Sequence, residues 1–72
     1  MDNNIKAIRK RLGFKQEDLA QKCNVSRQTI NAIENNKYDP SLILAFRLAS
    51  ILQVTVDEVF NYKAGDWYIL IF

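Results

Sequence analysis

Apolar residues recur through positions 5–60 at intervals of three and four, the period of an α-helix that buries one face. The pattern predicts an all-α fold, a compact bundle of five short helices. Their starts are expected close to Ile5, Lys15 or Gln16, Ser26, Ser41 and Thr55. The side chains expected to form the core are Ile5, Ile8, Leu12, Ala20, Val25, Ile30, Ile33, Leu42, Ala45, Leu48, Ala49 and Leu52.

Capping and turn residues separate these periodic stretches. Gly13 stands where a helix C-terminus favours glycine, and Asn24 tolerates the left-handed backbone that a tight turn requires. Ser26 and Ser41 are good N-caps, and the segment Thr55–Glu58 has the spacing of a capping box. The local signals therefore agree with the helical periodicity.

The segment 16–35 carries the most informative pattern in the chain. An apolar-periodic helix is followed by a short turn at Asn24 and by a second helix that buries Ile30 and Ile33. Ala20 supplies a small side chain where the two helix backbones must approach. This is the helix-turn-helix arrangement, in which the second helix enters the major groove of DNA.

The outer face of that second helix follows from turning it by about 100° per residue away from its buried side. Gln28 and Asn35 point outward, with Asn31 and Ala32 beside them. An ordinary solvated helix face would mix Lys and Glu. Amide side chains can pair with adenine edges, and alanine can touch a thymine methyl group. The residues predicted to read bases are Arg27, Gln28, Asn31 and Ala32.

The charge is distributed unevenly along the chain. Residues 1–37 carry eight basic and four acidic groups, whereas residues 38–72 carry two basic and four acidic groups. The first part is therefore at +4 and the second at −2, for the total of +2. The positive part coincides with the helix-turn-helix, as attraction to phosphate requires. A solvated basic face would give the same asymmetry.

Several kinds of chemistry are excluded by the residue types present. The sequence has no histidine and a single cysteine, so a histidine-dependent triad and a cysteine-based zinc cluster are ruled out. No glycine-rich phosphate loop or acid pair suited to catalysis stands out, and we expect neither an enzyme nor a bound metal or cofactor. Cys23 falls where a small apolar side chain is needed, so core packing is the preferred interpretation and redox sensing the alternative.

The length of 72 residues leaves room for one core, which is marginal unless oligomerisation adds buried surface. There is no secretory leader and no apolar run long enough to span a bilayer, so we expect a cytoplasmic protein. The helical domain is placed at residues 1–62 and an apolar tail at residues 63–72.

The helix-turn-helix segment resembles that of the Cro/C1-type (XRE) repressors, and residues 1–62 fit that family's five-helix, lambda-repressor-like domain. The run Val25-Ser-Arg-Gln-Thr-Ile-Asn-Ala-Ile-Glu-Asn-Asn-Lys-Tyr-Asp-Pro-Ser-Leu42 is similar to the small stand-alone repressors of the cytolysin-repressor type. The resemblance implies a transcriptional repressor that binds palindromic operators in double-stranded DNA as a homodimer.

The same resemblance implies roles for individual residues. A buried ion pair is expected between Arg9 and Glu34, and Asn36 occupies a position where the family commonly has glycine. Gln16 is expected both to touch the DNA backbone and to buttress the recognition helix. The residues assigned to phosphate contact or positioning are Gln16, Ser26, Thr29, Asn35, Asn36, Lys37 and Tyr38.

The tail Trp67–Phe72 has strong strand preference and would be an aggregation hazard if it were exposed. Relatives of this type pair a C-terminal strand with an N-terminal one, which here would involve residues 2–4. Three interpretations stay open: a strand or hairpin on its own domain, a strand exchanged across a dimer, or a docking peptide for another protein. The side chains assigned to the dimer interface are Val56, Val59, Phe60, Trp67, Ile69 and Ile71.

Three functions are consistent with these features. A homodimeric transcriptional repressor is the first, and an antitoxin that binds its operator and a toxin is the second. The third is a protein-interaction or membrane-surface adaptor that acts through the apolar tail. A preference for one DNA sequence over others would separate the first two from the third.

Overall fold

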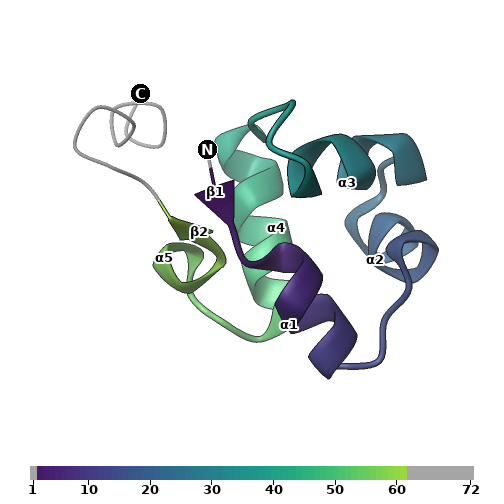
Figure 1. The fold of residues 1–72 in the computed structure, drawn as a ribbon, viewed down its shortest axis with the longest axis horizontal. Coiled ribbons are helices and arrows are strands. Elements are labelled where there is room, and N and C mark those ends of the chain that lie inside the picture. The colour runs from purple at the N-terminus through teal and green to yellow at the C-terminus, as the bar shows by residue number, and fades with distance from the viewer. Residues whose placement is uncertain (1, 62–72) are drawn as a thin grey trace.

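A computed structural model describes residues 2–61 and confirms the five-helix architecture (Figure 1). The elements in chain order are β1 (Asp2–Asn3), α1 (Ile5–Arg11), α2 (Gln16–Cys23), α3 (Arg27–Glu34), α4 (Leu42–Leu52), α5 (Val56–Val59) and β2 (Phe60–Asn61). Figure 1 shows α2 and α3 together at one end, α5 and β2 at the other, and α1 and α4 between them. The helix-turn-helix is thus the outer layer at one end of the domain.

The core is shared by all five helices, and α4 contributes most to it. Leu48 and Ala45 are fully buried, as the periodicity predicts. The prediction is wrong for Leu42 and Leu12, whose side chains are 44% and 38% exposed, and it missed Leu44, which is buried. The buried positions of α4 are Leu44, Ala45, Leu48, Ala49 and Leu52. They recur at intervals of three and four, whereas Leu42 is the first residue of α4 and lies at the edge of that buried face.

Three turn predictions are confirmed by the backbone. Gly13, after α1, has φ +80°, and Asn24, after α2, has φ 59°. Asn36, after α3, has φ 61° and thus takes the left-handed conformation that glycine adopts at lower cost. These three residues end α1, α2 and α3 at the expected places.

The predicted N-caps are also present. The Ser26 hydroxyl accepts a hydrogen bond from the Thr29 amide at 3.2 Å, and the Ser41 hydroxyl accepts one from the Leu44 amide at 3.2 Å. In α5 the Glu58 carboxylate reaches back to the Thr55 amide at 3.1 Å, which is the reciprocal half of the capping box. The capping residues therefore fix the starts of α3, α4 and α5.

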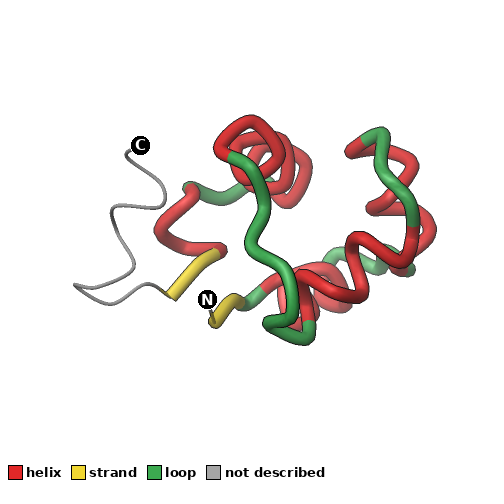
Figure 2. The backbone as a smooth tube through the Cα atoms, turned by 90° about the horizontal axis from the view of Figure 1, so that it is seen from above, coloured by secondary structure: helices red, strands yellow, loops and turns green. Residues whose placement is uncertain are grey.

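A two-stranded antiparallel sheet joins the ends of the described chain. Asp2 is opposite Asn61 and Asn3 is opposite Phe60. Figure 2 shows the two strands in yellow, beside each other at the edge of the helices. An N-terminal strand was expected, but its partner begins at Phe60, immediately after α5. The tail Trp67–Phe72, for which strand formation was expected, lies outside the described residues.

Candidate nucleic-acid interface

The helix-turn-helix is held together by a left-handed turn and an N-cap. Asn24 ends α2, and the Val25 amide donates to the Ala20 carbonyl at 3.0 Å. Ala20 is 3% exposed and belongs to the core. Ser26 then caps α3. The turn is thus short and fully determined by residues that the sequence identified.

The buried face of α3 is formed by Ile30 and Ile33, which are 0% and 1% exposed. Of the four residues expected to read bases, Arg27, Gln28 and Asn31 are exposed, and Ala32 is partly buried. The helix therefore presents the expected polar and amide side chains away from the core.

The amide side chains on α3 differ in how they are bonded. Asn35 donates through Nδ2 to the Asn31 carbonyl at 2.9 Å and to Asn31 Oδ1 at 3.2 Å. One lone pair of Asn31 Oδ1 is therefore engaged. The side chain of Gln28 makes no hydrogen bond to any other residue between 2 and 61. Its whole amide is available for a ligand such as a base edge.

The hydroxyl groups at the start of α3 are paired with each other. Ser26 Oγ and Thr29 Oγ1 lie 3.0 Å apart, in addition to the bond from the Thr29 amide to Ser26. Thr29 is partly buried and Ser26 is exposed. These two residues, which were assigned to phosphate positioning, therefore hold the first turn of α3 in place.

Glu34, at the end of α3, is the centre of a polar network that reaches two other helices. Arg9 Nε of α1 donates to Glu34 Oε2 at 2.8 Å, and Arg9 Nη2 donates to Oε1 at 3.2 Å. The two side chains are 9% and 3% exposed, so the expected buried ion pair is present. Gln16 Nε2 of α2 donates to Glu34 Oε1 at 3.1 Å. The buttressing role expected for Gln16 thus has a direct structural basis.

The segment after α3 brings together the remaining residues assigned to phosphate contact. Asn35, Asn36, Lys37 and Tyr38 are all exposed. The Asn36 amide donates to the Ile33 carbonyl at 3.1 Å and the Lys37 amide to the Ala32 carbonyl at 2.9 Å. This pair of bonds is the Schellman motif, which fixes the backbone of the segment.

Of the side chains assigned to a dimer interface, Val59 and Phe60 are 0% and 1% exposed. Both belong to the domain's own core, so they offer no surface to a second copy. Val56 is partly buried and packs against the core. Trp67, Ile69 and Ile71 lie outside the described residues. Buried apolar side chains at the end of a domain cannot be told from interface side chains by periodicity alone.

Three apolar side chains of α4 are exposed, of which the sequence placed Leu42 in the core and did not single out Ile43 and Phe46. Ile43 and Phe46 of α4 are 66% and 58% exposed, and Leu42 beside them is 44% exposed. Positions 42, 43 and 46 share one face of the helix because residues three and four apart are neighbours. We call this set the α4 patch. Because α4 carries apolar residues on two faces, its periodicity did not single out these three as exposed.

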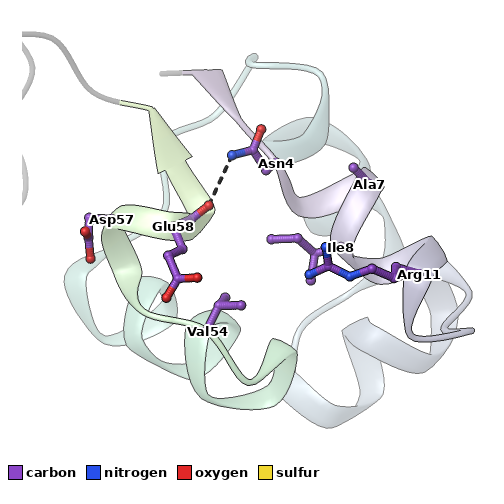
Figure 3. Close-up of a pocket in the computed structure, with 7 residues that line it drawn as sticks. All are labelled: Asn4, Ala7, Ile8, Arg11, Val54, Asp57 and Glu58. Carbon is purple, nitrogen blue, oxygen red and sulfur yellow. Dashed lines mark hydrogen bonds between the residues drawn. The ribbon is translucent and has the colours of Figure 1, made fainter.

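A shallow groove of about 420 Å³ lies between α1 and α5 (Figure 3). Arg11 lines it from α1 and Glu58 from α5, but the Glu58 carboxylate also caps α5 through Thr55. None of the seven lining residues belongs to α2 or α3. The groove is therefore separate from the helix-turn-helix.

Cys23 is 0% exposed and packs in the core, as the preferred interpretation expects. Burial raises the pKa of its thiol, and the positive charge of Arg47 opposes this shift. A buried thiol of raised pKa is a poor nucleophile. Within residues 2–61 no group of three or more acidic or cysteine side chains is arranged to hold a metal ion. Of the helices in the same range, none has the length and apolar content that crossing a membrane requires.

Comparison with known proteins is consistent with this geometry. A family model described as helix-turn-helix matches residues 5–59. An HTH-type transcriptional regulator of Methanocaldococcus jannaschii is 51% identical over 66 residues, which are 92% of this chain and 100% of that protein. The chain therefore belongs to the helix-turn-helix family of DNA-binding transcriptional regulators of the Cro/C1 type.

Solved structures show the same fold. The restriction-modification controller protein C.AhdI from Aeromonas hydrophila superposes with a TM-score of 0.72 at 27% identity, covering 78% of this chain and 85% of that chain. SinR, a master regulator for biofilm formation, was solved in complex with DNA. It superposes with a TM-score of 0.67 at 32% identity, covering 72% of this chain and 84% of that chain. The lambda-repressor-like fold inferred from the sequence is thus confirmed.

Proposed function

We propose that this regulator is a homodimeric repressor that reads a palindromic operator in double-stranded DNA through the outer face of α3. The observation that carries the proposal concerns the side-chain amide of Gln28. Its amide is exposed and makes no hydrogen bond within residues 2–61. A glutamine amide in this state can pair in a bidentate manner with adenine in the major groove.

Arg27, Asn31 and Ala32 complete the base-reading surface in this proposal. Asn31 Oδ1 accepts from Asn35, and within residues 2–61 no acceptor is bonded to its Nδ2 donors. Arg27 is exposed at the first position of α3 and can reach a guanine edge or a phosphate. Ala32 gives a close, small contact suited to a thymine methyl group. One helix face thus offers a donor set, an acceptor and an apolar contact.

Phosphate contacts position the recognition helix in the groove and come from residues of α2, α3 and the segment after α3. Lys37 lies beyond the C-terminus of α3, and Gln16 lies at the N-terminus of α2. Ser26, Thr29, Asn35, Asn36 and Tyr38 are the other residues assigned to this role. Such contacts supply affinity and orientation but little sequence preference.

A second copy of the chain gives the two-fold symmetry that a palindrome requires. The α4 patch is the surface we propose for the contact, because a contiguous set of exposed apolar side chains on a small domain marks an interaction site. Repression follows when the bound dimer overlaps a promoter and excludes polymerase.

The test is a selection of duplexes from a random library, followed by fluorescence-anisotropy titrations at two salt concentrations. We expect the selected duplex to bind about 10³-fold more tightly than a shuffled one. The change Gln28→Ala should cost about 1–3 kcal/mol at the selected site and relax preference at one base pair.

The control variant is Gln21→Ala, which removes an exposed amide from α2 instead of α3. It should leave the base preference intact. Equal binding of selected and shuffled duplexes would contradict sequence-specific recognition. A uniform loss of affinity in Gln28→Ala, with unchanged preference, would make Gln28 a positioning residue.

A further inference from the structure

Asn36, the left-handed residue after the recognition helix, has a side chain that is bonded at both ends to the N-terminal strand. Asn36 Oδ1 accepts a hydrogen bond from Asn3 Nδ2 at 3.2 Å. Asn36 Nδ2 donates to Asp2 Oδ1 at 3.1 Å. Asn3 Nδ2 also donates to the Ile33 carbonyl in the last turn of α3, at 2.8 Å. Three hydrogen bonds therefore connect β1 to the end of the recognition helix.

The backbone alone does not explain an asparagine at this position. The φ of 61° and the two Schellman hydrogen bonds require a left-handed residue, and glycine takes that conformation with less strain. An asparagine side chain adds one donor group and one acceptor, and both are used here. The side chain at this position thus has a partner, which glycine would not have.

The strand that holds Asn36 is itself firmly attached to the domain. β1 pairs with β2, and the Asn4 amide donates to the Val59 carbonyl at 2.7 Å. Asn3 Oδ1 accepts from the Ile5 amide at 3.2 Å, at the start of α1. Asn3 is partly buried. It therefore connects a fixed strand to a loop that is otherwise exposed.

We propose that Asp2 and Asn3 are positioning residues for DNA binding, which act through Asn36 to hold Lys37 against a phosphate. Lys37 follows Asn36 directly, so the direction of its side chain depends on the backbone that the Asn36 contacts restrain. A lysine pays less conformational entropy on binding when its backbone is already ordered. The inference rests on the proposed DNA-binding role and assigns part of its affinity to the N-terminal strand.

The main test is Asn36→Gly. This change keeps the left-handed backbone and removes the side-chain hydrogen bonds of Asn36 to Asp2 and Asn3. Affinity for the selected duplex should fall roughly tenfold, as for one lost charge-assisted hydrogen bond. The slope of log affinity against log salt should become shallower by about 0.9 for each bound protomer. Lys37→Ala should give the same change of slope and should add nothing in the Asn36→Gly background.

The matched control is Gln53→Gly, since Gln53 also has a left-handed backbone, with φ 62°, at the end of α4. It should bind DNA with unchanged affinity and slope. Asn3→Ala should also lower the affinity for DNA. The double variant Asn3→Ala, Asn36→Gly should bind as tightly as whichever single variant has the lower affinity. The fold of each variant is checked by circular dichroism and thermal unfolding.

An unchanged salt slope in Asn36→Gly overturns the proposal. The proposal is also overturned if Lys37→Ala lowers the affinity of the Asn36→Gly variant as much as it lowers that of the natural chain. Lys37 would then reach its phosphate without help from the strand. A lower affinity with an unchanged slope assigns a direct, neutral DNA contact to Asn36 and also overturns it. If no duplex is preferred by the natural sequence, the proposed function fails instead, which the selection step shows before any variant is made.

Discussion

At the scale of single residues, the polar interior of this domain is concentrated on one carboxylate. Glu34 accepts hydrogen bonds from Arg9 and Gln16, and Arg9 also donates through Nη1 to the Phe14 carbonyl at 3.0 Å. Among the described residues no buried side-chain nitrogen or oxygen lacks a hydrogen-bond partner. The network joins α1 and α2 to the end of α3. It therefore fixes the position of the recognition helix relative to these two helices.

The change Arg9→Ala should be strongly destabilising, by about 3–5 kcal/mol, because it leaves a buried carboxylate without its partner. The free energy of unfolding is measured by urea titration followed by circular dichroism. Lys10→Ala, which removes an exposed cation from the same helix, is the control and should change stability by less than about 0.5 kcal/mol. Equal effects of the two substitutions would show that the ion pair contributes nothing specific.

Cys23 predicts a dependence of stability on pH. Burial holds the pKa of its thiol above the ordinary value of 9.0, so the native state favours the neutral form. Above that pH the unfolded chain loses the proton more readily than the folded chain, and stability falls as pH rises toward the native pKa. The stability difference between the natural chain and Cys23→Ala, from urea titrations at pH 7 and pH 10, should narrow at pH 10. A constant difference would contradict the raised pKa.

At the scale of elements, local signals predicted most of the fold. Gly13, Asn24, Ser26 and Ser41 mark helix ends in the sequence and in the structure, because capping depends on residues within one turn. Leu42 was misplaced because α4 has apolar residues on two faces. Which face is buried depends on the packing of other helices and cannot be read from one helix.

Contacts between distant residues were the part that sequence could not supply. The bonds of Asn3 to Ile33 and Asn36 span 30 and 33 positions. The strand pair that brings them together covers only two residues on each side, too few for an alternation pattern. The Arg9–Glu34 pair was anticipated only through the resemblance to a family, since nothing in local spacing joins two residues that are 25 positions apart.

The N-cap of α4 predicts that two serines, Ser41 and Ser50, differ in how much stability is lost when each is changed to alanine. Ser41→Ala should cost about 1 kcal/mol of stability, because the Leu44 amide loses its acceptor. Ser50→Ala, at an exposed position within α4, should stay within about 0.5 kcal/mol of the natural chain. Urea titration measures both. Equal losses would mean that the Ser41 hydroxyl does not cap the helix in solution.

At the scale of the whole molecule, the domain is small, with principal extents of 31 × 20 × 19 Å. Two domains of this size side by side can place their recognition helices about 34 Å apart, one turn of DNA. The polar face of α3 and the apolar patch of α4 then serve different partners. A dimer also adds buried apolar surface to a domain that buries little by itself.

The α4 patch can be tested by changing one of its side chains to an acid. Phe46→Glu should shift the chain from dimer to monomer in analytical ultracentrifugation, because a carboxylate would be desolvated in the contact. Gln21→Glu adds the same charge at an exposed position of α2, outside the patch, and should leave the dimer intact. A dimer that persists in Phe46→Glu would place the contact on another surface.

The spacing of the operator halves is the strictest consequence of a two-fold dimer. Inserting about five base pairs between the halves of the selected duplex turns one half to the opposite side of the DNA, since the helical repeat is about 10.5 base pairs. A dimer whose two recognition helices are held at a fixed distance then engages one half only. Affinity should fall to that of a duplex with a single half, measured by anisotropy at fixed salt. Insertion of the same base pairs outside the two halves is the control and should have no effect. Unchanged affinity for the separated halves would show that each domain binds independently, and the two-fold arrangement would have to be abandoned.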